Sequence, residues 1–366
     1  MKKKATDMLL DIVKLYSPTG NESSVSLYLM NAMNSLGYTT SIDSVGNCIG
    51  HLGRGNPTVL LCGHMDTVPP ELPVRIEGEL LHGRGSVDAK APLAALIIAG
   101  KLAYDEGFPG SLIVVGSVCE EGDNRGVKEL ITLNIRAEFA VFGEPTDTFS
   151  LSIGYRGCSV IEFTVSNDSG HSSVPWVFLN AVEKTYDFYS FLKTNAGELA
   201  PSPIGFESLS ISVRQIEGGE NIGVLPRKCV MIVEFRLPPT VVTSVFRKWL
   251  NEKVTEFFAN NPKVKIEYKI LDEVDPILTD KKNMLVKAFS QIIYQTSGRP
   301  VKLLKKTGTS DMNNYAHAFG VPTITYGPGD SRLSHSLNEK IRLDDYLLSI
   351  EVIKKSLLRL AVLYQS

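Results

Sequence analysis

The sequence predicts an α/β fold in which a helix-covered, mostly parallel sheet is interrupted by an inserted α+β domain. An apolar run at 111–118 has the composition of a central strand covered on both faces. Strand-like and helix-like segments alternate before residue 150 and again after residue 276, which is typical of a parallel sheet. From Leu151 the pattern changes to alternating polar and apolar runs. We therefore expect one domain built from residues 1–153 and 273–366, and a second domain at 154–272.

The first part of the chain has the periodicity of helices separated by short strands. Apolar residues at 8–16 recur at helical spacing, and Ser17-Pro18-Thr19-Gly20 ends that helix. A second helix is expected over 22–36, because Gly37 ends the pattern. The other elements expected here are strands at 38–42, 48–52, 58–62, 111–118 and 137–142, and helices at 88–104 and 125–133.

The rest of the chain divides into the inserted domain and a return to the α/β pattern. In the inserted domain we expect strands at 158–165, 207–213, 229–237 and 263–271, and helices at 177–194 and 241–259. After Pro276 we expect helices at 282–296, 312–319 and 344–364, and strands at 300–304 and 321–326.

The composition excludes several classes of protein. Among 366 residues, 38 basic and 40 acidic side chains give a formal charge of −2, whereas a general nucleic-acid binder usually carries a strongly basic domain. No apolar run reaches the ~20 residues that a membrane-spanning helix needs, so no membrane partner is expected. The five cysteines are scattered without a CxxC pair, which indicates reduced thiols in a cytoplasmic protein and excludes zinc sites of the finger type.

Histidines and carboxylates gather at loop positions that follow predicted strands. In open α/β sheets, ligands bind at the carboxyl ends of the strands, so these side chains are expected to meet. Two imidazoles with several carboxylates suit divalent zinc, cobalt or manganese better than calcium or copper. The residues at these positions are His64, Asp66, Asp88, Glu120, Glu121, Glu144 and His335.

These residues can divide the work of a hydrolytic site. Two metals about 3.5–4 Å apart need a bridging carboxylate, and a bridged pair lowers the pKa of a shared water towards neutrality. Of the adjacent Glu120 and Glu121, one can ligate a metal while its neighbour acts as general base. Asp66 is placed to orient His64, or its partner ligand, without touching the metal.

These segments resemble the di-zinc aminoacylase/carboxypeptidase family, which includes acetylornithine deacetylase and succinyl-diaminopimelate desuccinylase. The resemblance covers nearly the whole chain and is carried by the motifs around the residues just named. It implies two Zn2+ (or Co2+) per subunit. It further implies that Asp88 bridges the two ions, that Glu120 is the general base, and that the other metal ligands are His64, Glu121, Glu144 and His335.

The resemblance also implies that the inserted domain is a dimerisation lid. Ser169-Gly170-His171-Ser172 matches the segment whose histidine enters the active site of the partner subunit and stabilises the oxyanion of the tetrahedral intermediate. A homodimer with His171 as a catalytic residue is therefore expected. One position departs from the family pattern, because Gly223 stands where relatives usually carry Asn. Asn221 lies two residues earlier, and whether it makes the usual partner contact stays open.

Substrate contacts are implied at four further positions. Arg156 resembles a family arginine that contacts the substrate, and Arg236 resembles one that holds a substrate carboxylate, a task that suits a bidentate guanidinium. Gly308 and Thr309 match a loop that lines the pocket. Glu144, where the aminopeptidase branch has Asp, favours with Arg236 an N-acylated amino acid that has a free α-carboxylate.

The stretches 306–313 and 322–335 look most like one branch of this family. Its members release lysine or ornithine from the C-terminal Glu of a small acidic carrier protein of the LysW type, in lysine and arginine biosynthesis. The choice between lysine and ornithine stays open, as do N-acetylornithine deacetylase and N-succinyl-diaminopimelate desuccinylase as alternative activities. Basic side chains that flank the loops would steer an acidic carrier, although charged loops are more often simply solvated: Lys302, Lys305, Lys306 and Arg332.

Two other classes of protein fit less well. A metal-free binding protein on the same fold would be expected to have lost a ligand or Glu120, and none is missing. A redox or nucleotide-dependent enzyme would show a GxGxxG motif or a P-loop after a strand, and the sequence has neither there. The sequence therefore predicts a di-metal amide hydrolase.

Overall fold

The chain forms two compact units, seen in a computed structural model that describes residues 2–168, 170–200 and 202–365. The inserted unit consists of Tyr155–Leu278 with the short loop Lys306–Thr309. Its long segment thus ends at Leu278 rather than at residue 272. The larger unit is formed by Met1–Gly154, Thr279–Lys305 and Ser310–Ser366.

A mixed sheet forms the core of the larger unit. At its centre, β3 (Thr58–His64) runs parallel to β6 (Ser111–Ser117) on one side and to β7 (Phe139–Gly143) on the other. β15 (Thr323–Thr325) continues the parallel part beside β7, so the predicted parallel sheet is confirmed at its centre. Within this unit the strand order is β1-β2-β6-β3-β7-β15-β8, with β14 also paired with β8. The remaining strands are β1 (Thr39–Ile42), β2 (Cys48–Leu52), β8 (Ser150–Tyr155) and β14 (Lys302–Lys306), while β13 (Ile277–Leu278) ends the long segment of the inserted unit.

The edges of this sheet are antiparallel. β1 pairs with β2, and β2 pairs with β6, in opposite directions. On the other side, β15 meets β8 in an antiparallel pairing. The parallel strands at the centre are the ones that end at or shortly before His64, Glu120 and Glu144.

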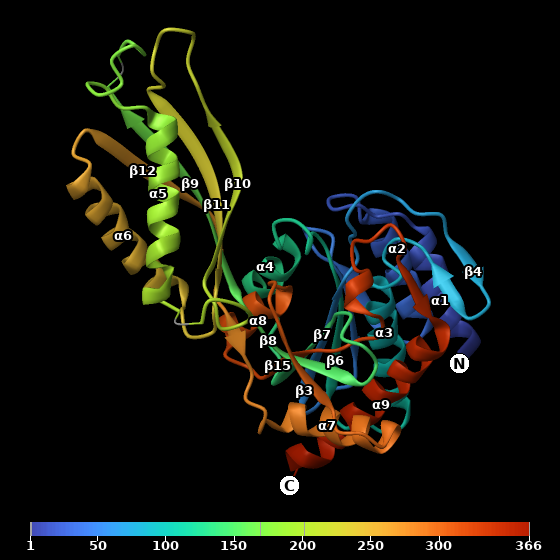
Figure 1. Ribbon diagram of the computed structural model, residues 1–366. Helices are drawn as coiled ribbons and strands as arrows, with labels where there is room; N and C mark the ends of the chain where they lie inside the picture. The colour runs from blue at the N-terminus through green and yellow to red at the C-terminus, as the bar shows by residue number, and fades with distance from the viewer. Residues whose placement is uncertain (1, 169, 201, 366) are drawn as a thin grey trace. The chain divides into compact units, whose positions relative to one another are not determined.

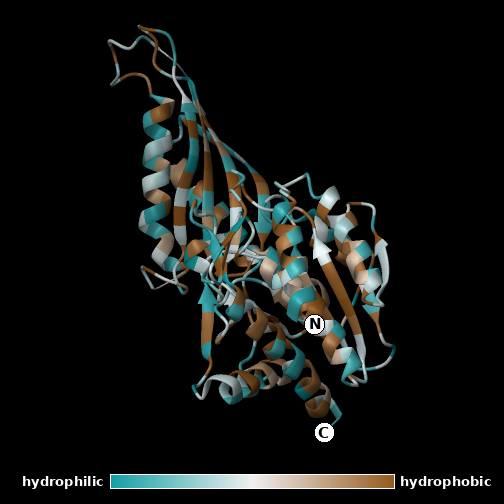
Figure 2. Cartoon of the chain, turned by 90° about the vertical axis from the view of Figure 1, so that its right-hand side faces the viewer, coloured by the Kyte–Doolittle hydropathy of each residue, from teal (hydrophilic) through white to brown (hydrophobic). Residues whose placement is uncertain are grey.

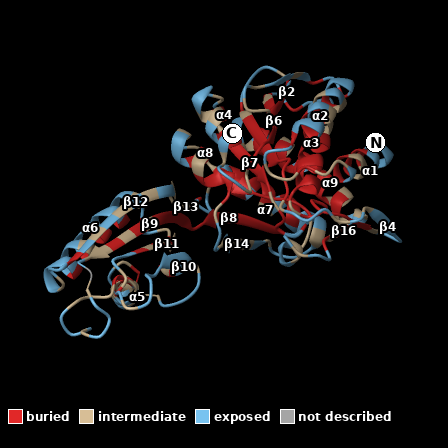
Figure 3. Ribbon diagram, turned by 90° about the horizontal axis from the view of Figure 1, so that it is seen from above, coloured by how far each residue is buried: buried red, intermediate tan, exposed pale blue. Residues whose placement is uncertain are grey.

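Helices cover the central strands, which are buried along almost their whole length (Figure 3). α3 contacts β3, β6 and β7, and α9 packs along α3 and α7. α8 contacts β7, β15 and α4, while α2 contacts β1 and β2. The helices of this unit are α1 (Lys2–Lys14), α2 (Ser23–Ser35), α3 (Lys90–Asp105), α4 (Arg125–Thr132), α7 (Met284–Ser297), α8 (Asp311–Phe319) and α9 (Leu343–Gln365).

Glycines allow α3 to approach the sheet closely. A Cβ atom at Gly63 would lie 3.1 Å from Leu93 Cβ, and one at Gly143 would lie 2.9 Å from Leu96 Cδ1. Since every residue of α3 from Lys90 to Gly100 is buried, the helix fills the interior with small and apolar side chains. This packing fixes the start of α3, directly after the Asp88 loop.

A small second sheet of the larger unit has the order β16-β5-β4. β5 (Leu80–His82) pairs antiparallel with both β4 (Arg75–Glu77) and β16 (Lys340–Arg342), and His82 lies opposite Lys340. The pairing brings the loop that leads to Asp88 beside the segment that follows His335.

The inserted unit is an antiparallel sheet with helices, as predicted. Its strand order is β10-β11-β9-β12, and α5 and α6 pack against the sheet and each other (Figure 1). Buried and less buried residues alternate along β11, and the strands and helices of this unit carry both hydrophobic and hydrophilic residues (Figure 2). Its elements are β9 (Gly157–Asn167), α5 (Ala181–Asn195), β10 (Ser210–Gly218), β11 (Lys228–Leu237), α6 (Thr243–Asn260) and β12 (Val264–Val274).

None of the helices in the described ranges is both long enough and apolar enough to cross a membrane.

Candidate metal centre

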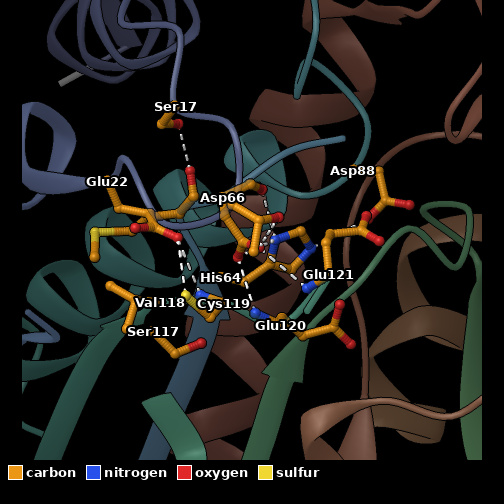
Figure 4. Close-up of polar contacts among 12 residues, drawn as sticks. Ser17, Glu22, His64, Asp66, Asp88, Ser117, Val118, Cys119, Glu120 and Glu121 are labelled. Atoms are coloured by element: carbon orange, nitrogen blue, oxygen red, sulfur yellow. Dashed lines mark hydrogen bonds and ion pairs between the residues drawn. The ribbon is translucent and has the colours of Figure 1, made fainter. Parts of the chain in front are cut away.

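His64 ends β3, so the central strand carries it to the carboxyl edge of the sheet. Its Nδ1 lies 2.8 Å from the backbone oxygen of Asp66, and its Nε2 lies 3.2 Å from Oδ1 of Asp88 (Figure 4). Because Nδ1–H can donate to that carbonyl, Nε2 is the ring nitrogen turned toward Asp88 and is the one placed to bind a metal ion. Burial lowers the pKa of His64, but hydrogen bonds to Asp66 and Asp88 outweigh it and raise this pKa well above its usual value.

Asp88 lies between two histidines, with one carboxylate oxygen toward each. Oδ1 faces His64, and Oδ2 is 3.5 Å from Nε2 of His335. The same Nε2 of His335 is 2.6 Å from Oε1 of Glu121. A carboxylate in this position can bridge two metal ions.

The backbone of His335 is strained. Its φ is 61°, a left-handed conformation that is uncommon for a residue other than glycine. Such outliers persist only where the surrounding structure holds them, and they cluster at functional sites. The loop around His335 must therefore be held by contacts of its own.

Asp66 holds the two glutamates that follow β6. Its Oδ1 accepts the backbone N–H of Glu120 at 3.0 Å, and its Oδ2 accepts that of Glu121 at 3.1 Å (Figure 4). The Thr19 hydroxyl donates to Oδ2 at 2.9 Å. Oδ1 also lies 3.4 Å from Nδ1 of His64. In this geometry one buried carboxylate orients His64, Glu120 and Glu121 together.

Glu120 has the surroundings of a proton carrier. Burial is the largest cause that raises the pKa of its carboxyl well above the usual range, and the negative charge of Glu144 adds to it. Its neighbour Glu121 instead contacts His335. The two adjacent acids thus differ in the way that one base and one ligand require.

The donor set fits a pair of divalent ions. Ligand atoms of His64, Asp88 and Glu121 all lie within 4.8 Å of one another. His335 joins this group through its contacts with Asp88 and Glu121. Glu144 is near enough to act on the pKa of Glu120. Imidazole nitrogens with carboxylate oxygens are a ligand chemistry of zinc and cobalt.

Asp311 and Asn124 lie beside this cluster, and the sequence did not predict their contacts. The carboxylate of Asp311 is buried and accepts hydrogen bonds from Ser117 Oγ at 3.0 Å and Asn124 Nδ2 at 3.1 Å. Asn124 Nδ2 also donates to the backbone oxygen of Glu120 at 3.2 Å. Burial raises the pKa of Asp311 to about 6. Ser310-Asp311 before a helical pattern predicts the start of a helix. It does not predict that Asp311 contacts Ser117, because the two residues are 194 positions apart in the sequence.

The inserted unit carries the other predicted site residues, of which His171 is exposed. Its Nδ1 accepts the backbone N–H of Ser173 at 3.1 Å. The His171 segment pairs with the segment after Asn221, because Ser172 N–H donates to Gly223 O and Leu225 N–H to Gly170 O, each at 3.0 Å. Asn221 and His171 are thus carried by neighbouring, paired segments. Ser169 lies outside the described residues.

Arg156 and Arg236 have different surroundings. Arg156 is buried, and its guanidinium donates to the backbone oxygens of Thr307 at 2.9 Å and Ser208 at 3.3 Å, so it holds the 306–309 loop to the residues before β10. Arg236 is partly exposed and donates to Thr309 Oγ1 at 3.3 Å. Arg236 and Thr309 therefore meet, with Gly308 exposed in the same loop. Arg156 instead donates to backbone oxygens and to the hydroxyls of Ser208 and Ser210.

Comparison with known proteins supplies independent findings. The sequence model described as peptidase family M20/M25/M40 matches residues 60–359. A putative LysW-lysine/LysW-ornithine hydrolase of Thermococcus kodakarensis is 35% identical over 351 residues, which cover 96% of this chain and 90% of that protein. A LysW-lysine hydrolase of Deinococcus radiodurans is 30% identical over 362 residues, which cover 97% of each.

Solved structures share the fold at low identity. A tripeptidase from Staphylococcus aureus superimposes with a TM-score of 0.83 at 20% identity over 99% of both chains. An M20 family metallo-carboxypeptidase from Sulfolobus solfataricus gives 0.80 at 16% identity, over 98% of this chain and 99% of that one. A dinuclear metal binding peptidase of the M20 family from Bacillus subtilis gives 0.76 at 10% identity, over 99% and 98%. At these identities the likeness concerns the fold alone.

Proposed function

The chain belongs to peptidase family M20/M25/M40, and we propose that it releases lysine or ornithine from a LysW-type carrier protein. The bond cleaved is the amide between the C-terminal Glu of the carrier and the α-amino group of the released amino acid. One observation carries the reaction type: Asp88 faces both His64 and His335, with Glu120 beside them. The full-length similarity to LysW-lysine hydrolases supports the substrate.

We propose that each subunit holds two Zn2+ or Co2+ ions. His64 and Glu144 would hold one and Glu121 and His335 the other, with Asp88 shared between them. The 2.6 Å contact between His335 Nε2 and Glu121 Oε1 supports this division, because donors to one ion lie close together. When bound, such ions polarise the scissile carbonyl and lower the pKa of the attacking water.

Glu120 moves the proton of the reaction. It accepts a proton from the attacking water and delivers it to the amide nitrogen, as the new C–O bond forms and the C–N bond breaks. Desolvation and the negative charge of Glu144 act on this carboxyl, and such surroundings suit a group that carries a proton. Arg236 and Thr309 would hold the α-carboxylate of the amino acid that leaves.

We further propose a homodimer in which His171 completes the site of the partner subunit and stabilises the oxyanion there. Exposed apolar side chains near His171 in the sequence and in the paired segment support an interface. Trp176 is 79% exposed, and Ile222 is fully exposed. Clustered apolar exposure of this kind marks interaction surfaces.

The carrier is proposed to be recognised partly by charge. Lys302, Lys305 and Arg332 are exposed, and Lys306 is half-buried. A positive rim would attract a small acidic protein and raise its association rate. We place the reaction in the cytoplasm, in lysine or arginine biosynthesis, since all five cysteines are buried and free.

A substrate panel tests this function. Protein loaded with zinc or cobalt is offered carrier-linked lysine, carrier-linked ornithine, N-acetylornithine and N-succinyl-diaminopimelate, and the released amino acid is detected by mass. Preference for the carrier conjugates supports the proposal. Preference for a small acyl-amino acid would keep the metal centre and Glu120 but assign the protein to the deacetylase or desuccinylase branch.

A further inference from the structure

Arg84 and Glu339 form a buried ion pair that lies outside the ligand set. Their side chains are 2% and 0% exposed, and Nη1 of Arg84 lies 2.8 Å from Oε2 of Glu339. The two residues are 255 positions apart in the chain and meet because β5 pairs with β16. Removing two charges from water is expensive, so a buried pair of this kind contributes little to stability by itself. Its contacts point to another task.

Each partner of the pair holds one part of the ligand set by its backbone. Oε1 of Glu339 accepts the N–H of Val87 at 2.9 Å and the N–H of Asp88 at 3.0 Å. Nη1 of Arg84 donates to the backbone oxygen of Ser336 at 3.0 Å, directly after His335. A continuous chain of short polar contacts therefore joins the backbone of Asp88 to the His335 loop.

The two histidines depend on this chain of contacts to different degrees. His64 is buried, ends a central strand and is held by the backbone oxygen of Asp66. His335 lies on a loop, its side chain is 51% exposed, and its own backbone has a φ of 61°. His335 is thus the ligand that needs an external restraint.

We propose that Arg84 and Glu339, together the Arg84–Glu339 clamp, are positioning residues that hold the His335 ring against the bridging carboxylate of Asp88. The inference rests on the proposed di-metal function. The clamp thereby sets the affinity of the ion at His335 and Glu121, whereas the ion at His64 depends on β3 and Asp66. Loss of the clamp should weaken the two ions unequally.

The decisive variant combines Arg84→Met with Glu339→Gln. A single substitution would leave an unpaired buried charge and risk unfolding, whereas the double variant removes both charges. Gln at position 339 retains an oxygen that can accept the N–H groups of Val87 and Asp88. Besides the ion pair, the double variant therefore loses the hydrogen bonds of Arg84 to the backbone oxygens of Ser336 and Pro70. Arg84→Lys is the milder second variant, because its shorter side chain can keep a positive charge beside Glu339 but reaches less far toward the Ser336 oxygen, which Nη1 of Arg84 contacts as well.

The experiment is a cobalt titration of the metal-free protein. Calorimetry and the visible absorption of bound Co2+ monitor the binding of the first and the second ion. We expect the first ion to bind the double variant as it binds wild type and the second to bind about 10–100-fold more weakly, the usual effect of losing a partner behind a ligand. Arg84→Lys should give a smaller loss confined to the second ion. The control is Glu106→Gln, which removes the Lys354–Glu106 pair of the same unit and should leave both ions unchanged.

Two results would overturn the clamp: unchanged affinity for both ions in the double variant, or equal weakening of both together with a lower melting temperature of the metal-free protein. The second result would mark a purely structural pair. A wild-type protein that binds fewer than two ions would instead contradict the proposed centre. Failure of wild type to cleave any carrier conjugate would contradict the proposed substrate and leave the titration result standing.

Discussion

Glu120 and Glu121 are neighbours in the chain but reach different surroundings. Asp66 accepts both of their backbone N–H groups, so the turn is fixed as one unit. From that turn, the carboxylate of Glu121 meets His335, while burial and the charge of Glu144 act on Glu120. The backbone thus sets the position of both acids, and the local environment of each side chain sets its chemistry.

The substitution Glu120→Ala tests this division of roles. The variant keeps the hydrogen bond from the backbone N–H of residue 120 to Asp66, so the protein should still bind two metal ions. Because the proton carrier is lost, kcat should fall by about 10²–10⁴-fold, the usual contribution of a general base. Steady-state kinetics and metal analysis of the same preparation measure both effects, and near-normal kcat would show that another group is the base.

The residues at strand ends were predictable, as was Asp66 beside His64, whereas the groups that hold them from distant parts of the chain were not. His64 ends one apolar strand, Glu120 and Glu121 come shortly after another, and the carboxyl ends of parallel strands share one edge. Arg84 contacts Glu339, which is 255 residues away, and Asp311 contacts Ser117, which is 194 residues away. No local sequence pattern predicts contacts over such separations. The sequence around Arg156 does not distinguish an arginine that binds substrate from one that donates hydrogen bonds to the backbone, as Arg156 does.

At the scale of elements, long periodic segments were predicted well and short ones poorly. The strand expected at 111–118 is β6 at Ser111–Ser117. The helix expected from residue 177 starts only at Ala181, because the side chain of Asn180 accepts the N–H of Val182 and caps it there. The three-residue strands of the small sheet are too short to show a period, so their pairing was not foreseen.

Two helix caps of the larger unit give a matched test. Ser310 caps α8 in a capping box with Asn313, and Asn283 caps α7 by accepting the N–H of Leu285. Ser310→Ala and Asn283→Ala should each lower the free energy of unfolding by about 1 kcal/mol. Only α8 carries Asp311 to Ser117 and Asn124, so only Ser310→Ala should also lower kcat. Denaturant titration and kinetics at one temperature measure the pair, and equal kcat losses would contradict the role of α8.

At the scale of the whole molecule, two inactive variants should restore activity when they share a dimer. In the proposed homodimer, a Glu120→Ala subunit paired with a His171→Ala subunit would form one complete site, because the intact Glu120 of one subunit would meet the intact His171 of the other. Each homodimer has none. The heterodimer, purified through two different tags, should therefore show about half of the wild-type activity per dimer. An inactive heterodimer would mean that His171 serves its own subunit or no site.

Charge reversal tests the recognition of the carrier. Lys305→Glu with Lys306→Glu should raise KM for the carrier conjugate by on the order of tenfold at low salt, because steering depends on long-range charge. KM for a small N-acyl-lysine should stay unchanged, and added salt should shrink the difference. Lys281→Glu with Lys282→Glu is the control, since these exposed residues lie in the turn before α7 rather than on β14 and give the same change in net charge. Equal losses on both substrates would contradict steering.

The chain order of the ligands governs when the centre can assemble. During translation, N-terminal segments emerge first and can fold while the rest is still being made. His64, Asp88, Glu120 and Glu121 are then already present, but the second histidine and both halves of the clamp are complete only once residue 339 has left the ribosome. A nascent chain therefore holds the carboxylates of the proposed site together with His64 but without His335. We expect the two ions to bind only after translation is complete.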